Sequence, residues 1–553
     1  MSFRIQAIAW FKSICNHMDK TRRDTWDLAR KSLRIVLCVA GLVVLFIVYT
    51  WGISRNPPGF YLDESATAYN AYLVSRTGAG EFGPRFPVLF QEYAGDKATY
   101  INPLTIDLLA IVFRFLHPSI LVARTFAAFW MFAACLLLGV LATRISGRRN
   151  IGIIVAGSAL LTPWLFEIGR LVWDAHFSCF TIVVFLLAAY RIQSKENWNW
   201  RDILLVAASL GVISYGYLSG RVLAPLFALG LLFFATSRHR FFGILKIWLA
   251  YAVTLVPLIL FNRSHSGVLT KRLWEVSYIK PDAPWKEIPS EIAEFVRCYL
   301  QDQSLSPLLM IGDGHWHHHV EGSGGAMLFG TFILATTGLL LVIARRWRDP
   351  WWRFVLYGLA ASIVPGAMTD WPFHELRLMG YAVFLLVLTI PALKWLLASV
   401  ELNERVGNTT DTTHDGKPGS AVVASPGLPR RIRMSILALL LAATVAQFVG
   451  FQLIFWRKGL DREFAFDVRY KDAYDAAVAR SERPIILENG QWGPAYMHAY
   501  WYATVEGRPL SEFVRLDGGA KPPPGAIVLI SNSDCQNCEV IKKYLQYELY
   551  KAK

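Results

Sequence analysis

Eleven apolar runs, each about the length that crosses a lipid bilayer, constrain this chain more than any other feature of its sequence. A transmembrane helix needs roughly 17 to 25 mainly apolar residues. The runs lie at about 33–53, 120–143, 150–166, 175–191, 202–218, 222–237, 243–261, 327–344, 353–369, 377–398 and 435–456. A content of 54% hydrophobic and only 18% charged residues agrees, because soluble proteins carry more charge. The sequence therefore predicts an all-α polytopic membrane protein.

Basic residues mark every second loop and set the predicted orientation. Cytoplasmic loops collect lysine and arginine, so the basic loops are placed inside. They are the segment before residue 33 and the loops at 144–149, 191–201, 238–246, 345–353 and 430–433. An odd number of spans then puts the N-terminus in the cytoplasm and the C-terminus outside. Because such loops also account for the net charge of +15, no nucleic-acid partner is expected.

The spans divide the chain into predicted parts. A basic cytoplasmic segment (1–32) precedes a transmembrane domain (33–456) and an outer C-terminal domain (457–553). The transmembrane domain contains two long outer loops and one flexible cytoplasmic linker rich in glycine, serine and threonine, at 54–119, 262–326 and 399–434 respectively.

One further segment, "NPLTIDLLAIVFRFLHP" (102–118), is short and carries two charges. It is predicted to be a helix in the outer interface, since counting it as a span would invert every later loop. We therefore expect about 11 to 13 transmembrane helices.

The outer C-terminal part is mostly polar and contains the strand-like stretches "PIILEN" and "GAIVLIS", which predict a small α/β domain. Cys535 and Cys538 lie in this part, where an oxidising compartment favours a local disulfide over a metal site. A thioredoxin-like redox role is not favoured, because no βαβ pattern is visible around the two cysteines.

Carboxylates and cations gather at the predicted outer ends of several spans. Asp63 and Glu64 stand side by side in "GFYLDESATAYNAYLVSRTG". They are either helix-capping residues or a general base or metal ligand at the mouth of a membrane cavity. Lys97 either snorkels to the interface or is a cation held at headgroup depth, where it neutralises a lipid phosphate.

Charged residues near the ends of other spans need a similar explanation, because a charge at the centre of a span costs about 2.5–3.5 kcal/mol. Arg170 is expected either to pair with Glu167 or Asp174 at helical spacing or to serve a function. The remaining candidates at span ends are Arg124, Arg221, His374 and Arg377, together with Tyr215, whose alternative is a place in the ordinary aromatic belt.

The loop "GDGHWHHHVEGSGG" carries four histidines within five residues, together with Asp313 and Glu321. Imidazole and carboxylate groups suit zinc or a similar divalent ion. The alternative is a solvated, glycine-rich loop whose histidines have no function. Since the middles of the spans carry almost no charge, the pattern favours chemistry at the outer membrane boundary over transport through the membrane.

Several of these stretches occur together in a known family. They are "DESATAYNAYLVSRTG", "EYAGDKATYINPL", "VARTFAAF", "TPWLFEIGRLVWDAHF", "YGYLSGRVLAPL", "GDGHWHHHVEGSGG" and "FHELRLMGYAVFLL". In this order they resemble bacterial lipid-carrier-dependent glycosyltransferases, relatives of the protein O-mannosyltransferases and of the lipid A aminoarabinose transferase, in the glycosyltransferase-C (GT-C) class. The resemblance covers most of residues 55–400. This chain departs from the family pattern at Ala98-Thr99, where the family has Pro-Pro, and at Gly169, where it has Ser.

The resemblance implies a GT-C fold and an inverting glycosyltransferase. Its donor would be a polyprenyl-phosphate sugar such as an undecaprenyl-phosphate sugar, and its acceptor a lipid, a glycan or a protein. The site would face the periplasm from a bacterial inner membrane. Asp63 would be the base, assisted by Glu64 and Asp174. Residues expected at the donor are Lys97, Arg124, Arg170, Tyr215, Arg221, His374 and Arg377.

A divalent ion such as Mg²⁺, Mn²⁺ or Zn²⁺ is a further expectation, with Asp96 and His318 as its candidate ligands, His318 being the best match to the single histidine of the family loop. Two other functions remain open from the sequence. One is a flippase or transporter of a sugar-linked lipid, and the other is a ligase or polymerase of surface polysaccharide that uses a lipid-diphosphate donor.

Overall fold

The computed structural model describes residues 30–95, 98–282, 284–398, 428–489, 494–516, 520–531, 535 and 538–553. The chain forms two compact units, and the boundary between them in the sequence lies between Gly52 and Ile53. Within the first unit, the helix Arg30–Tyr49 is apolar and long enough to cross a membrane. The second unit holds all the candidate site residues that the structure describes.

Each of the eleven predicted spans is helical. After Arg30–Tyr49, they are α4 (Ile120–Ser146), α5 (Arg149–Leu161) with α6 (Pro163–Ile168), α7 (His176–Gln193), α8 (Trp200–Gly216), α9 (Gly220–Gly230) with the 3-10 turn η2 (Leu231–Phe234), α10 (Arg238–Ser264), α13 (Phe329–Arg345), α14 (Pro350–Ala361) with α15 (Val364–Ala367), α16 (Met379–Leu396) and α17 (Arg430–Lys458). Six helices of the described chain have by themselves the length and apolarity of a membrane span. The predicted all-α membrane architecture is confirmed.

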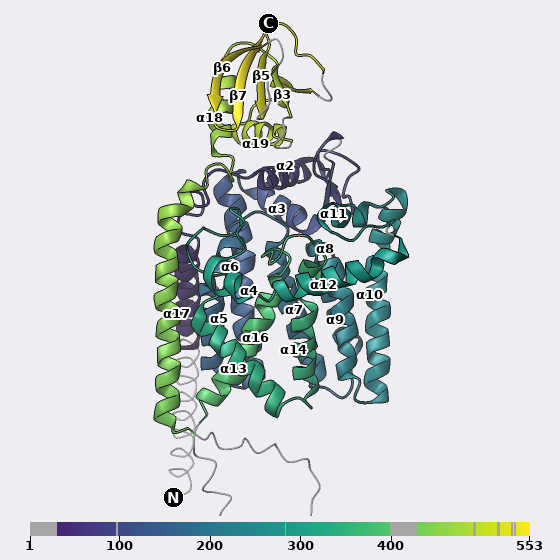
Figure 1. The fold of residues 1–553 in the computed structure, drawn as a ribbon, viewed down its shortest axis with the longest axis vertical. Helices are drawn as coiled ribbons and strands as arrows, with labels where there is room; N and C mark the ends of the chain where they lie inside the picture. The colour runs from purple at the N-terminus through teal and green to yellow at the C-terminus, as the bar shows by residue number, and fades with distance from the viewer. Residues whose placement is uncertain are drawn as a thin grey trace, which may run out of the picture. The chain divides into compact units, whose positions relative to one another are not determined.

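Local sequence explains where these helices break. Thr162 precedes Pro163, and a residue before proline is pushed out of the helical region. Thr162 accordingly has φ −68° and ψ 118°, and Pro163 begins α6 at a position where its missing N–H costs nothing. The predicted span 150–166 is therefore two helices. In contrast α16 is apolar on all sides and almost wholly buried, since it packs against α13, α14, α5, α4 and α7 (Figure 1).

Shorter elements connect the spans. They are α2 (Leu62–Thr77), β1 (Phe90–Gln91), β2 (Tyr100–Ile101), α3 (Pro103–Phe115), α11 (Val268–Val276), η3 (Trp285–Glu287), α12 (Ile288–Gln301) and η4 (Pro307–Ile311). Figure 1 shows α2 lying across the ends of the long helices. The segment predicted to lie in the interface forms α3, which buries one face against α2.

The C-terminal part is an α/β structure, as the sequence predicts. It contains η5 (Gly459–Asp461), α18 (Val468–Val478), β3 (Ile485–Glu488), α19 (Tyr496–Glu506), η6 (Leu510–Glu512), β4 (Phe513–Leu516), β5 (Ile527–Ser531), β6 (Cys538–Tyr544) and β7 (Tyr547–Ala552). The sheet order is β4-β3-β5-β7-β6. Strand β3 pairs in parallel with β4 and β5, and β7 pairs antiparallel with β5 and β6.

The predicted disulfide is confirmed, because Cys535 and Cys538 are bonded to each other. The sequence-based statement that no βαβ pattern is present needs correction, since β3, α19 and the parallel strand β4 form one. The cysteines nevertheless lie outside this unit, because Cys535 stands between β5 and β6 and Cys538 begins β6, and a thioredoxin-like motif does not occupy that position.

The C-terminal part shares a hydrophobic core with the loop elements that begin the second unit. Phe60 and Phe113 pack against Trp501 of α19, with ring centroids 5.2 and 6.2 Å from that of Trp501. Ser65 of α2 hydrogen-bonds to His498 of α19 at 2.8 Å. The domain boundary at 457 stays a prediction, but the packing shows what holds α2 in place.

Candidate active site

Asp63 lies in the first turn of α2 and is half-buried. Its Oδ1 accepts a 2.6 Å hydrogen bond from the hydroxyl of Tyr93, which follows β1. Burial raises the pKa of the Asp63 carboxyl above its usual range, while the Tyr93 hydrogen bond and the positive charge of Arg272 oppose this rise. Asp63 is therefore a carboxylate with more than ordinary basicity.

Two more carboxyl groups share its surroundings. Burial raises the pKa of Glu92 well above its usual range, and the charges of Asp63 and Asp174 add to the effect. Burial also raises the pKa of Asp174 to about 6, against a 3.0 Å hydrogen bond donated by the side-chain amide of Asn102. Carboxyl groups this close disfavour one another's ionisation, so the cluster holds its charge only beside cations.

One such cation comes from α9. Arg221, in the first turn of that helix, donates a 2.7 Å hydrogen bond to Oδ1 of Asn102. The amide nitrogen of Asn102 donates in turn to Asp174, as described above. Asn102 is thus the link that holds a guanidinium and a carboxylate at fixed places in one chain of hydrogen bonds.

The other cations come from α11. Arg272 pairs with Glu275 at 3.0 Å, and its charge lowers the pKa of Asp63. Lys271 donates a 2.9 Å hydrogen bond to the carbonyl of Ala98. Both side chains line a small depression whose other residues are Thr99, Tyr100, Leu218, Arg221, Val268 and Glu275. Three basic side chains against one acidic one make this depression suited to an anion.

Two tyrosines stand where α8 ends: the predicted Tyr215, in the last turn of α8, and Tyr217, which follows the helix. The hydroxyl of Tyr215 donates 2.8 Å to the carbonyl of Thr254 in α10. The pKa of Tyr217 is raised by burial and by the charge of Asp174, while the charge of Arg377 opposes the rise. Nη1 of Arg377 donates a 2.6 Å hydrogen bond to the hydroxyl of Thr369, and its predicted role at the donor stays a prediction.

Glu64 and Arg124 form an ion pair sealed inside the protein. Nε and Nη2 of Arg124 contact the two carboxylate oxygens of Glu64 at 2.9 and 2.7 Å, and both side chains are fully buried. Glu64 also accepts the N–H groups of Tyr61 and Val172, and Arg124 donates to the carbonyl of Pro57. The capping alternative thus holds for Glu64. This geometry gives the pair a positioning role that ties α2 to α4. The roles of Glu64 and Arg124 at the substrate stay predictions.

Arg170 is buried in the same way. Its Nε donates 3.1 Å to the carbonyl of Asn56, and its guanidinium lies over the ring of Phe166 at 4.7 Å. Glu167, one of its two predicted partners, contacts Arg462 at 3.4 Å. Arg170 therefore lies in the packed interior beside α6 and α17, and its predicted role at the donor stays a prediction.

The histidine-rich loop packs into the protein. His318 and His319 are only 2% and 3% exposed, so the alternative of a solvated loop is wrong for these residues. His318 Nδ1 lies 2.5 Å from Oδ2 of Asp313, and His319 Nδ1 lies 3.1 Å from Oε1 of Glu167. His374 lies close by, its ring centroid 4.8 Å from that of His318. The predicted donor-binding residue His374 is thus part of a histidine cluster.

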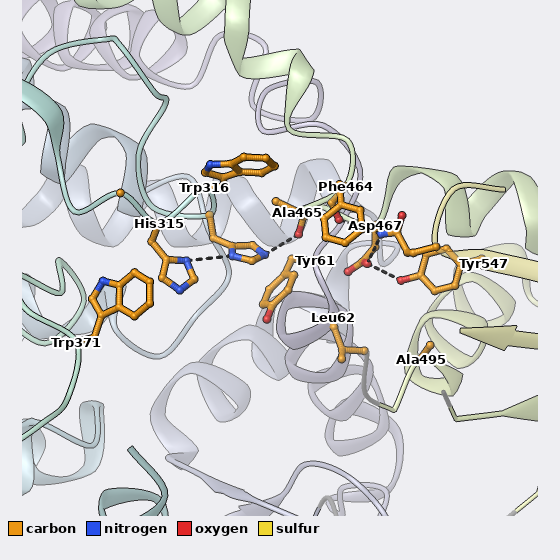
Figure 2. A pocket seen from close by; sticks show the side chains of 13 residues that line it. Tyr61, Leu62, His315, Trp316, Trp371, Phe464, Ala465, Asp467, Ala495 and Tyr547 are labelled. Atoms are coloured by element: carbon orange, nitrogen blue, oxygen red, sulfur yellow. Dashed lines mark hydrogen bonds between the residues drawn. The ribbon is translucent and has the colours of Figure 1, made fainter. Parts of the chain in front are cut away.

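A cavity of about 350 Å³ lies beside this cluster (Figure 2). Its walls come from the start of α2, the histidine-rich loop, the segment before α16 and the C-terminal part, and they consist of Tyr61, Leu62, Gly314, His315, Trp316, His317, Trp371, Phe464, Ala465, Asp467, Ala495, Gln546 and Tyr547. Figure 2 shows Tyr61 between the histidines and the Asp467–Tyr547 hydrogen bond. Since Tyr61 and Leu62 directly precede Asp63, the cavity lies next to the carboxylate.

The structure thus brings half of the predicted residues together in two clusters. Asp63, Asp174, Arg221 and Arg377 form one cluster, and His318 and His374 form a second. Lys97 and Asp96 lie outside the described residues, so their predicted roles stay predictions. Sequence reasoning missed Tyr93, Tyr217, Lys271 and Arg272 as site residues, and it did not include Glu92 among the candidate site residues. The stretch "FQEYAGDKATY" could have indicated Glu92 and Tyr93, because it places both residues shortly before the candidate Lys97.

Comparison with known proteins rests on structure alone, because no protein-family model and no curated protein matches the sequence. ArnT from Cupriavidus metallidurans in the apo state superposes with a TM-score of 0.56 at 11% identity, over 93% of this chain and 98% of that one. ArnT from the same organism bound to undecaprenyl phosphate superposes with a TM-score of 0.53, also at 11% identity, over 94% and 97% of the two chains. Together with the helical architecture described above, these matches show that the chain has the GT-C fold, over nearly the full length of both proteins.

Proposed function

We propose that this protein transfers a sugar from a polyprenyl-phosphate donor to an acceptor hydroxyl at the outer face of the membrane, with inversion at the anomeric carbon. The observation that carries the proposal is the arrangement of Asp63 beside a depression lined by Arg221, Lys271 and Arg272. Such a site offers a base for the incoming group and cations for a departing phosphate. The shared fold with ArnT supports this choice of reaction class.

Asp63 acts as the base in this proposal. A general base works best when its pKa approaches the working pH, and burial moves the pKa of Asp63 in that direction. The Tyr93 hydroxyl holds one carboxylate oxygen, and the other, which accepts no hydrogen bond from the described residues, takes up the proton of the acceptor in this proposal. Asp174, fixed by Asn102, is placed to orient the acceptor or the sugar.

The lipid phosphate is the leaving group and takes up negative charge as the glycosidic bond breaks. Cations already in place stabilise that charge without reorganisation, which is the usual source of the largest rate gains. Arg221 and Arg272 are held by Asn102 and Glu275, so they are preorganised for this task. Lys271 and Arg377 complete the cationic side of the site in this proposal, and the sequence predicts that Lys97 joins them.

The acceptor enters through the cavity beside Tyr61 in this proposal. Ligand sites are concave and mainly apolar with a few polar groups, which describes its aromatic and histidine walls. Since the C-terminal part supplies Phe464, Asp467 and Tyr547 to these walls, it is expected to select the acceptor. A lipid, a glycan or a protein segment with a free hydroxyl fits the requirement.

Purified protein in detergent, incubated with a panel of short-chain polyprenyl-phosphate sugars carrying a radiolabel, tests the proposal. We expect release or transfer of label from at least one donor. Movement of intact lipid-linked sugar across liposomes, with no release from any donor, would favour the flippase alternative. Turnover of lipid-diphosphate donors alone would favour the polysaccharide ligase or polymerase.

Arg272→Ala is expected to weaken donor use by about 10- to 100-fold in kcat/KM, because a charge-assisted hydrogen bond contributes about 1.5–3 kcal/mol. Steady-state kinetics with a soluble donor analogue measure the change. Arg297→Ala is the matched control, since Arg297 is an exposed arginine of α12 that pairs with Glu294. An unchanged kcat/KM in Arg272→Ala would remove this residue from the phosphate site.

The pH dependence of transfer reports on the base. Asp63 must be ionised to act, so activity should fall as the pH drops through its raised pKa. The Tyr93 hydroxyl stabilises the ionised form, so Tyr93→Phe should raise that pKa further and move the acid limb to higher pH by about one to two units. A pH–rate profile of kcat/KM for both proteins decides this, and a shift to lower pH would contradict the assignment.

A further inference from the structure

Asp313, His318 and His374 form a cluster that the proposed transfer reaction does not use. Each offers one atom that can bind a metal ion, and the three atoms all lie within 4.8 Å of one another. All three residues are buried. They come from two parts of the chain, since Asp313 and His318 belong to the loop before α13 and His374 lies in the segment before α16.

The backbone around the cluster holds the carboxylate in a fixed orientation. The N–H of His315 donates to Oδ1 of Asp313 at 2.8 Å, and the N–H of Glu375 donates to Oδ2 at 3.2 Å. Two amides from two different loops therefore fix the plane of one carboxylate. Support of this kind around a ligand is typical of metal sites, in which the groups behind the ligands orient them.

One member of the cluster has no other explanation. A buried hydrogen bond between Asp313 and His318 would by itself be an ordinary polar contact, but it leaves His374 unexplained. His374 is only 9% exposed, and its buried Nδ1 has no hydrogen-bond partner among the described residues. A buried polar atom without a partner costs free energy unless something absent from the protein atoms satisfies it.

We propose that Asp313, His318 and His374 together bind one divalent transition-metal ion. Two imidazoles and one carboxylate are donors that zinc accepts in proteins. A tetrahedral zinc with bonds of about 2.0–2.2 Å sets its ligand atoms about 3.3 Å apart. Binding would therefore separate His318 Nδ1 and Asp313 Oδ2, which lie 2.5 Å apart, and would draw the most distant pair of atoms, within 4.8 Å of each other, closer together. The ring of His315 stacks on that of His318, with the centroids 4.5 Å apart, and His315 also lines the cavity. In this proposal the ion reaches the cluster from the cavity.

This site differs from the one expected from the sequence. Asp96 and His318 were the predicted ligands, and of these only His318 lies in the described part of the chain, where it meets Asp313 and His374. An ion there joins the loop before α13 to the segment before α16. These two segments carry the cavity residues His315 and Trp371, so the ion acts as a clamp on one wall of the cavity.

Metal analysis of the full-length protein in detergent tests the site without any sugar donor. The protein is stripped with a chelator, incubated with ZnCl₂, freed of excess ion and measured by mass spectrometry of its elements. We expect about one tightly held zinc per chain, and a loss of that ion in both His374→Gln and Asp313→Asn. Cobalt added to the stripped protein should give the visible absorption of a tetrahedral site in the wild type only.

His265→Gln serves as the matched control, because His265 is an exposed histidine at the end of α10 that should leave the zinc content unchanged. Each variant is compared only if it elutes from gel filtration as the wild type does. Failure of the stripped wild type to bind zinc or cobalt beyond the level of His374→Gln would overturn the proposal, whatever the folding of the variants. Because no donor is present, this result is independent of whether the protein transfers sugar.

Discussion

Asp63→Asn is expected to lower the rate of sugar transfer by about 10²- to 10⁴-fold, the range that a positioned general base contributes. Asparagine keeps the size of the side chain and its hydrogen bond with Tyr93, but it cannot take up the acceptor proton. Single-turnover assays with a radiolabelled donor separate this effect from donor binding, which should change little. The loss should lie almost entirely in the chemical step.

Asp472→Asn is the matched control for this prediction. Asp472 is an exposed aspartate of α18 that pairs with Arg469 on the protein surface, so its replacement should leave transfer unchanged. Equal rates in wild type and Asp63→Asn would exclude Asp63 as the base and would direct attention to Asp174. An equal loss in both variants would point to a general effect on the protein instead.

Arg124→Met is expected to destabilise the protein by about 3–5 kcal/mol, because it leaves the buried Glu64 carboxylate without its partner. The guanidinium also donates to the carbonyl of Pro57, and this contact is lost as well. Thermal unfolding in detergent, followed by the loss of the gel-filtration peak, measures the effect. The variant should unfold at a clearly lower temperature and yield less protein.

The double variant Glu64→Gln/Arg124→Met distinguishes a buried charge from a general packing defect. If the unpaired carboxylate causes the loss, removing its charge should recover part of the stability, and the two changes will not be additive. Arg297 is an exposed arginine, so the Arg297→Met variant should have the same stability as the wild type. Wild-type stability in Arg124→Met would refute the positioning role assigned to this pair.

The sequence predicts the membrane architecture well because a bilayer leaves a spanning segment few choices other than an apolar helix. It could not tell which of two adjacent carboxylates belongs to the site. Neighbouring residues of a helix point in different directions, so Asp63 reaches Tyr93 while Glu64 turns into the interior toward Arg124. Which direction is the interior depends on how α2 packs, and no local pattern states that.

Arg272 shows a second limit. It stands in a segment that reads as part of one long loop, and only the folded chain brings α11 next to α9 and the start of α2. Tyr215 and Tyr217 are only two residues apart, yet Tyr215 donates a hydrogen bond to Thr254 of α10 while the charge of Asp174 acts on Tyr217. Convergence of distant segments is a tertiary property, which a single sequence does not carry in its periodicity.

The core that α2 shares with α19 has a consequence for how the protein is made. Ser65 and His498, which join the two helices, are separated by 433 positions in the sequence. A ribosome releases Asp63 and its neighbours long before it has synthesised the residues that pack behind them. The helix α2, which carries the proposed base, can therefore pack against α19 only after the last part of the chain has been synthesised. A chain that ends before α19 should thus lack the residues that hold Asp63 and its helix in place.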